Sequence, residues 1–268
     1  MKLLTLNCHS WMEENQQEKI KIIIDTILQK KYDIIALQEV NQSIDKKVLF
    51  KNIKEDNFAL TLINELKKSG CSEYEMLWDF SHIGYDKYEE GVSIITKHKI
   101  EKAYCFFATK SEDTSFWKTR KIIGASLNIK GNLIDVYSCH LGWWNDEDEP
   151  FKEQAHKILE RVNDDRLTFL MGDFNNNAFL RGEGYDYLIG KGMYDTYSMA
   201  KEKDNGVTVK GKIAGWNENK EDLRLDWILC NKKIQVKYSK VIFNGENRNV
   251  VSDHYGVEVK IEEGDFNG

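Results

Sequence analysis

Short polar clusters follow apolar, strand-like runs along the whole of this chain. They are Leu-Asn at Asn7, Gln-Glu at Glu39, Cys-His at His140, Gly-Asp-Phe-Asn-Asn at Asp173 and Asn175, Leu-Asp-Trp at Asp226, and Ser-Asp-His at Asp253 and His254. Carboxylate oxygens are the protein ligands that Mg²⁺ prefers, together with water and substrate phosphate. Neutral histidines and amides can hydrogen-bond a phosphoryl group or transfer protons. Such a set could therefore bind Mg²⁺ and hydrolyse a phosphate ester.

Each cluster taken singly has a structural explanation. A lone Asn at a strand end, such as Asn7, usually forms a turn. A Glu after an apolar run, such as Glu39, often only ends a strand, and a single His such as His140 is more often a buried, hydrogen-bonded side chain than a catalyst. The hypothesis of a shared site therefore depends on all the clusters occurring in one chain.

The elements that would position these clusters are mostly strands. Strands are expected at 2–7, 33–37, 74–80, 91–97, 102–108, 120–129, 133–138, 167–171, 225–230, 236–243 and 255–261, and helices at 13–30, 60–68 and from Pro150. Ser10 and Glu13 could form a capping box for the first helix. Short turns join several neighbouring strands, which favours mainly antiparallel sheets covered by a few helices, the α+β pattern, over a βαβ barrel. Polar groups beyond buried strands can then meet at one rim of a sheet.

Length and composition favour one cytoplasmic domain. The 268 residues include 41% hydrophobic residues and a single proline, so one domain over residues 1–268 is expected. The start MKLLTLNCHSW lacks the apolar core of a secretory signal, and no window reaches the length of a membrane span. Five cysteines without CxxC spacing indicate reduced thiols. The net charge of −6 disfavours a nucleic acid as partner.

Taken together, the clusters resemble the endonuclease/exonuclease/phosphatase superfamily. Its members include deoxyribonuclease I, exonuclease III-type repair enzymes, inositol-polyphosphate 5-phosphatases and neutral sphingomyelinases. The resemblance runs in the family's motif order from residue 2 to residue 261, through LLTLN, LQEV, SCHL, GDFNN, LDWIL and SDH. It implies an α/β fold, a four-layered sandwich of two mainly antiparallel β-sheets packed face to face with helices outside. It also implies a Mg²⁺-dependent phosphoesterase, with Mn²⁺ as a substitute cofactor.

The resemblance further implies which residues bind the metal and the reacting groups. Glu39 would be the main Mg²⁺ ligand, with Asp253 and Asn7 close to the ion. Asp173 and Asn175 would position the attacking water and the scissile phosphate. The number of metal ions is left open.

The remaining site residues would act on the phosphoryl group. His254, oriented by Asp226, would be an acid/base or phosphate-binding histidine, and His140 would contact the phosphoryl oxygens. Either Asp173 or His254 would take the proton from water. Arg120 in KTRKIIGASL matches a phosphate-binding arginine more loosely, with Lys118 and Lys121 as close competitors.

The segment that follows His140, LGWWNDEDEP, bears on the substrate. Trp143 and Trp144 could stack on a sugar ring; alternatively, one of them packs in the core and the acidic run is a solvated loop or a helix start. Trp11 and Trp117 are further candidates for such stacking, and packing is the favoured role for each. An acidic loop here would repel a polyanion yet tolerate a small phosphorylated sugar.

Three segments also resemble a bacterial subgroup of the superfamily that includes maltose 6′-phosphate phosphatase: LLTLNCHSWMEEN, LQEVNQS and HLGWWNDE. We therefore expect a cytoplasmic sugar-phosphate phosphatase whose partner is a small phosphorylated substrate, with neither nucleic acid nor a membrane as partner. The alternatives are a nuclease, which would need basic strips beside the site, and a sphingomyelinase-like phosphodiesterase. The latter should carry an exposed apolar hairpin, which the sequence does not indicate.

Overall fold

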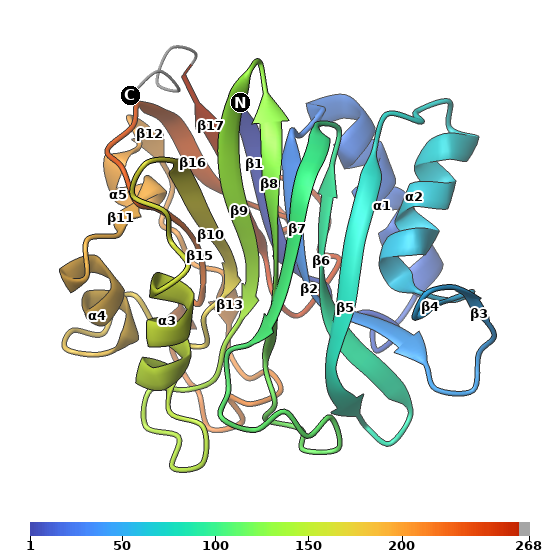
Figure 1. The fold of residues 1–268 in the computed structure, drawn as a ribbon, viewed down its shortest axis with the longest axis horizontal. Helices are drawn as coiled ribbons and strands as arrows, with labels where there is room; N and C mark the ends of the chain where they lie inside the picture. The colour runs from blue at the N-terminus through green and yellow to red at the C-terminus, as the bar shows by residue number, and fades with distance from the viewer. Residues whose placement is uncertain (263–268) are drawn as a thin grey trace.

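The computed structural model describes residues 1–262 and has four layers (Figure 1). Two sheets pack face to face, with helices α1 and α2 outside the first sheet and α3 and α4 outside the second. The helices are α1 (Gln16–Lys30), α2 (Phe58–Lys68), α3 (Phe151–Leu159), α4 (Gly184–Gly190) and the short α5 (Thr196–Met199). The predicted α/β sandwich is confirmed.

The first sheet has the order β12-β16-β17-β1-β2-β6-β5, and the second has the order β11-β15-β10-β9-β8-β7. The strands of the first are β12 (Glu202–Lys203), β16 (Val236–Ile242), β17 (Gly256–Ile261), β1 (Lys2–Asn7), β2 (Ile34–Ser43), β6 (Tyr88–Thr96) and β5 (Glu75–Gly84). Those of the second are β11 (Tyr194–Asp195), β15 (Asp226–Cys230), β10 (Leu167–Asp173), β9 (Asn132–His140), β8 (Lys121–Ile129) and β7 (Lys99–Phe107). Strand pairs in both sheets are antiparallel except β1–β2, β9–β10 and β12–β16.

Alternation along the strands produces the layers, because successive side chains point to opposite faces. In β1, Leu3 belongs to the apolar cluster between the two sheets, while Leu4 and Leu6 belong to the cluster under α1 and α2. In β9 and β10, Val136 and Phe169 face the first sheet. The same alternation, continued to the strand ends, directs polar side chains into the space between the sheets.

The start of α1 differs from the prediction. The helix begins at Gln16, and its N-cap is Asn15 in a left-handed conformation. Ser10 is not a cap, because its hydroxyl donates to the Glu39 carbonyl and accepts from the Asn41 amide. The capping box of Ser10 and Glu13 is therefore wrong.

Two small hairpins lie outside the large sheets: β3 (Val48–Phe50) with β4 (Ile53–Lys54), and β13 (Val209–Lys210) with β14 (Asp222–Leu223). The first hairpin protrudes at the lower right of Figure 1. Val48, Leu49 and Phe50 are about half exposed on it. An exposed apolar hairpin is thus present, contrary to expectation. No helix in residues 1–262 is long and apolar enough to cross a membrane.

Candidate active site

The candidate site lies where strands of both sheets end, away from the N-terminus (Figure 1). In the second sheet, Asp173 at the end of β10 pairs in register with His140 of β9 and with Asp226 of β15. In the first sheet, Asn7 ends β1. The Asn7 side-chain amide donates to Asp173 Oδ2 at 3.1 Å and to Glu39 Oε1 at 2.8 Å, so it joins the two sheets across the site.

Glu39 reaches the site through a bulge in β2. The pairing of β2 with β6 shifts register between Leu37 and Val40, and Glu39 has a φ of 49°. Simple alternation would place Glu39 on the same face as Leu37, which packs under the helices. A β-bulge re-aims side chains in this way, and here it brings the carboxylate to the space between the sheets.

The glycine of the Gly-Asp-Phe-Asn-Asn motif is required by close packing. Gly172 lies where β10 runs against β9, and a Cβ there would be 1.8 Å from the carbonyl oxygen of Cys139. Only glycine allows this approach of two backbones. It sets Asp173 and His140 side by side at the ends of their strands.

Asp173, Asp226 and His254 form a buried triad. His254 Nδ1 bonds Asp226 Oδ2 at 2.9 Å, and His254 Nε2 lies 3.7 Å from Asp173 Oδ2. Burial alone would lower the pKa of His254, but the charges of Asp226 and Asp173 raise it well above its usual value. Burial raises the pKa of Asp173 to about 7, while the His254 charge opposes that rise. His254 is therefore held as an imidazolium beside a carboxyl group that exchanges its proton near neutral pH.

A second group surrounds His140. Its Nε2 lies 3.9 Å from Glu39 Oε1 and 3.8 Å from Asp173 Oδ2, and its Nδ1 lies 3.9 Å from Glu90 Oε1. Burial and the nearby charge of Arg120 lower the pKa of His140 well below its usual value. Burial and the charge of Glu39 raise the pKa of Glu90 to about 8. A neutral His140 is thus free to donate a hydrogen bond to an oxygen between these carboxyl groups.

Arg120 carries a permanent positive charge at the site, in addition to the imidazolium of His254. It is 4% exposed, and its guanidinium donates to the carbonyls of Trp117 and Thr119. The Nε atom is buried and has no hydrogen-bond partner within residues 1–262. A buried donor left unpaired is costly, and a bound anion could remove that cost.

A cavity of about 310 Å³ is lined by these groups. Its polar lining consists of Glu39, His82, Glu90, Arg120, His140, Asp173, Asn175 and His254, and its aromatic lining of Tyr85, Trp117 and Trp143. Asn175 is fixed there, since its amide donates to the Leu141 carbonyl and its oxygen accepts from the Trp216 indole. The cavity thus combines the polar groups of a reaction centre with an aromatic wall.

The tryptophans separate into two kinds. Trp144 packs against Phe151 and Tyr187, with ring centroids 6.0 and 6.1 Å away, and does not line the cavity. Trp144 therefore does not fit the expectation of a substrate-binding residue, because its ring packs among the helices outside the second sheet. Trp117, for which packing was the favoured role and stacking the alternative, is 52% exposed and lines the cavity. Trp11 packs edge-on against Phe58, as expected.

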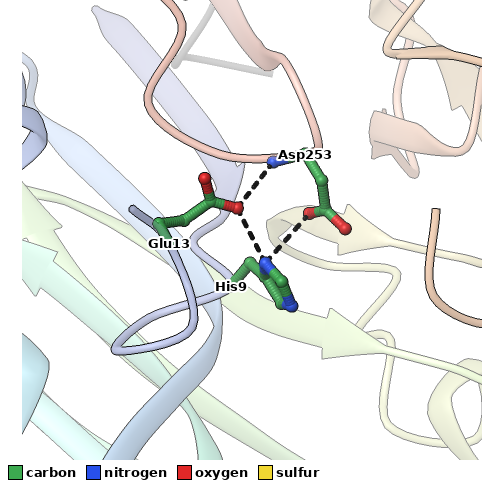
Figure 2. A group of neighbouring side chains, drawn as sticks. All are labelled: His9, Glu13 and Asp253. Carbon is green, nitrogen blue, oxygen red and sulfur yellow. Dashed lines mark hydrogen bonds and ion pairs between the residues drawn. The ribbon is translucent and has the colours of Figure 1, made fainter. Parts of the chain in front are cut away.

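Asp253 lies in a separate cluster with His9 and Glu13. Figure 2 shows His9 between the two carboxylates: its Nδ1 is 2.7 Å from Glu13 Oε1 and 3.8 Å from Asp253 Oδ1. Burial alone would lower the pKa of His9, but the hydrogen bond to Glu13 and the charges of Asp253 and Glu39 raise it to about 9. Glu13 also pairs with Lys19 and accepts from the Asp253 amide. The cluster thus fixes the loop that carries Asp253 against the start of the chain.

The donor set fits a divalent cation near Glu39. Within residues 1–262, three groups bring ligand atoms within 4.8 Å of one another: His9, Glu13 and Asp253; Glu39, Glu90 and His140; and Asp173, Asp226 and His254. Burial and the charge of Asp253 raise the pKa of Glu39, which marks an excess of negative charge. A bound cation would offset it. Glu39 and Asp253 belong to different groups, yet the effect of the Asp253 charge on Glu39 shows that the two carboxylates are close enough to interact.

Asn7 was expected close to the metal, and its side chain bonds the carboxylate of Glu39, the expected main ligand. Its side-chain oxygen accepts from the His9 amide at 3.1 Å, and its amide group donates to two carboxylates. An amide nitrogen donates and does not ligate a cation. In this geometry Asn7 orients Glu39 and Asp173.

Comparison with known proteins assigns the chain to a family. Residues 11–254 match the model of the endonuclease/exonuclease/phosphatase family. The chain belongs to this family. Enzymes of the endonuclease/exonuclease/phosphatase family hydrolyse phosphate esters and typically depend on a divalent metal, so this chain is a phosphoesterase. No curated protein matches its sequence.

Solved structures agree with this family assignment. An endonuclease/exonuclease/phosphatase family protein from Leptotrichia buccalis C-1013-b is 45% identical, with a TM-score of 0.91 over 98% of this chain and 99% of that one. The mannosyl-6-phosphatase Bt3783 of Bacteroides thetaiotaomicron VPI-5482 shares the fold at 17% identity, with a TM-score of 0.72 over 98% and 99%. A humanized D. rerio TDP2 does so at 14% identity, with a TM-score of 0.66 over 98% of each chain. The narrower resemblance to maltose 6′-phosphate phosphatase stays a prediction.

Sequence reasoning missed several residues of the site. Glu90 belongs to β6, which begins three residues earlier than predicted, and it shares a face with Val92 and Ile94. A period-two pattern extended from those residues would have found it. His82 and Tyr85 have no comparable signal, because they depend on how the β5–β6 hairpin meets the second sheet.

Proposed function

We propose that this protein is a Mg²⁺-dependent phosphatase that removes the phosphate from a small sugar phosphomonoester in the cytoplasm, acting as one domain over residues 1–268. The observation that carries the proposal is the cavity, which joins a phosphate-binding end around Arg120 to an aromatic wall in about 310 Å³. That volume suits a small ligand. Aromatic faces complement the C–H faces of a sugar ring.

The charges around the cavity favour a small substrate over a nucleic acid. Among the lining residues in the described part of the chain, Arg120 alone carries a permanent positive charge. Its neighbours Lys118 and Lys121 are paired, the first with Asp146 and Asp148 at 2.8 and 2.7 Å and the second with Asp79 at 3.0 Å. A polyanion needs several free cations along its backbone, whereas one phosphoryl group needs few.

Each residue at the phosphate-binding end of the cavity would have its own role in hydrolysis. Asp173 would accept the proton of the attacking water, since its raised pKa makes it a base near neutral pH. His254, charged through Asp226, would donate to the phosphoryl or leaving oxygen, and His140 and Arg120 would donate to the other phosphoryl oxygens. Positioning of this kind supplies most of the rate of phosphoryl transfer.

Glu39 and Asp253 would hold the metal. When bound, Mg²⁺ neutralises negative charge that develops on the phosphoryl oxygens. Asn7 would act through the two carboxylates that it joins. Asn175, whose amide nitrogen and oxygen are both hydrogen-bonded, would position the scissile phosphate for attack by water.

The likeness to the mannosyl-6-phosphatase supports a sugar phosphate, and the absence of a disulfide among the five cysteines supports a reducing compartment. The test is phosphate release, with Mg²⁺, from disaccharide 6′-phosphates, hexose 6-phosphates and a generic aryl phosphate, alongside plasmid nicking. We expect release from a sugar phosphate to be fastest and nicking to be negligible. Efficient nicking at physiological salt, with no release from any sugar phosphate, would favour the nuclease alternative.

A further inference from the structure

The aromatic wall of the cavity is built from loops that are distant in sequence. Trp117 lies between β7 and β8, and Trp143 follows β9. Their ring centroids are 6.0 Å apart at an interplanar angle of 60°. Trp117 is 52% exposed although a large apolar ring gains from burial. An exposed tryptophan held beside a reaction centre is typical of a ligand-binding surface.

The acidic run after Trp143 holds this wall together. Lys118, next to Trp117, pairs with Asp146 and Asp148. The carboxylate of Glu149 accepts from two backbone amides of the Trp117 loop, those of Lys110 at 2.7 Å and Ser111 at 2.8 Å. Asp146, Asp148 and Glu149 of the acidic run therefore bond the loop that carries Trp117. The ion pairs of Lys118 fix the position of its neighbour Trp117.

A third loop fixes Trp143. Gly215 has a φ of 79°, and a Cβ there would be 2.6 Å from Cζ2 of Trp143, so the backbone lies directly against the indole ring. The next residue, Trp216, donates to Asn175 at the phosphate end at 3.0 Å. The indole nitrogen of Trp143 has no hydrogen-bond partner among the described residues. That nitrogen is buried, so the surface that Trp143 offers a ligand is its ring, which the backbone at Gly215 holds rigidly.

We propose that Trp117 and Trp143 form a subsite for the unphosphorylated sugar unit of a disaccharide monophosphate, with Lys118 as its positioning residue. This inference rests on the proposed sugar phosphatase function and names which residues select the length of its substrate. The phosphorylated unit occupies the end of the cavity at Arg120 and His140. The second unit lies on the exposed ring of Trp117, away from the reacting phosphorus. Contacts there are equal in the ground and transition states, so they act on KM and leave kcat unchanged.

The experiment compares a disaccharide 6′-phosphate with the corresponding hexose 6-phosphate. Trp117→Ala should raise KM for the disaccharide phosphate about tenfold, the scale of an aromatic contact, with kcat nearly unchanged. KM for the hexose phosphate should stay within about twofold of wild type. Lys118→Met should show the same selective effect, and Lys118→Arg should restore KM. Phe179→Ala is the matched control, because Phe179 is an exposed aromatic residue that does not line the cavity.

A second readout follows binding without turnover. In EDTA, titration with the disaccharide phosphate should change the intrinsic tryptophan fluorescence of the wild type and should do so more weakly in Trp117→Ala. Equal changes of KM for both substrates, or no change for either, would overturn the subsite while leaving the proposed function in place. A wild type that releases phosphate from no sugar phosphate would overturn both.

Discussion

Replacing Asp226 by Asn tests the charge on His254. Asp226 is fully buried, and its Oδ2 accepts the 2.9 Å bond from His254 Nδ1. Asn keeps the shape of the side chain and removes the negative charge. The charge of Asp226 raises the pKa of His254 against the effect of burial, so the variant should release that proton at a lower pH.

The expected loss follows from the bond that is weakened. A buried hydrogen bond between charged groups contributes about 1.5–3 kcal/mol. If His254 acts as the imidazolium donor, a loss of about 2 kcal/mol in the transition state lowers kcat roughly thirtyfold at neutral pH. The deficit should grow as pH rises through the lowered pKa of His254 and shrink at lower pH, where the imidazole is protonated in both proteins.

The assay is phosphate release from the best sugar phosphate between about pH 6 and pH 9, with thermal unfolding as the measure of folding. Asp135→Asn is the matched control, since Asp135 is a buried carboxylate of the same sheet that bonds Ser126 outside the cavity. A kcat for Asp226→Asn within about threefold of wild type over this range would refute the reasoning. So would an equal loss in the control.

Three further outcomes are expected. Glu39→Gln should lower kcat by about two orders of magnitude with the fold intact, and EDTA should abolish wild-type activity until Mg²⁺ or Mn²⁺ is added; unchanged turnover at saturating Mg²⁺ would contradict the metal assignment. Arg120→Met should raise KM and lower kcat together for every phosphate ester, since its guanidinium is the permanent cation of the cavity lining; an effect on one substrate alone would contradict that role. Asp33→Asn should lower the unfolding free energy at pH 7 by about 1–2 kcal/mol, because bonds to His98 and the Lys2 amide hold the pKa of Asp33 below its usual value against the effect of burial. That stabilisation is complete above the pKa of Asp33 in the unfolded chain and is lost as pH falls below about 4. Urea unfolding at pH 7 and at a pH below about 4 should therefore show the difference in unfolding free energy between Asp33→Asn and wild type becoming smaller in acid.

The fold could be predicted well from local patterns. Apolar strand-like runs identified most of the long strands and indicated sheets covered by helices, and the family resemblance implied the four-layered sandwich. The errors lie where local signals are weak. The strand was expected to begin at Gly91, yet Glu90 is already a buried strand residue. Ser10 looks like a cap, yet a contact with β2 uses its hydroxyl.

The site could be predicted as a list of residues and only partly as a geometry. His140, Asp173, Asp226 and His254 were expected to act together, and the structure brings them together. His140 and Asp173 end β9 and β10, Asp226 begins β15, and His254 lies just before β17. The contacts of Asp253 with His9 and Glu13 depend on loops, and so does the exposure of Trp117. Such contacts come from the packing of distant segments, which no local pattern encodes.

The place of β1 between β17 and β2 has a consequence for synthesis of the protein. Asn7 leaves the ribosome about 250 residues before β17 does, which at ordinary translation rates is roughly ten to fifty seconds. During that time β1 has an edge without its partner strand, and the reaction centre lacks His254. Unpaired edges of this kind invite association with other chains. We therefore expect the nascent protein to be inactive and prone to aggregation until β17 is synthesised. We also expect its yield in cells to depend on chaperones even if the folded protein is stable.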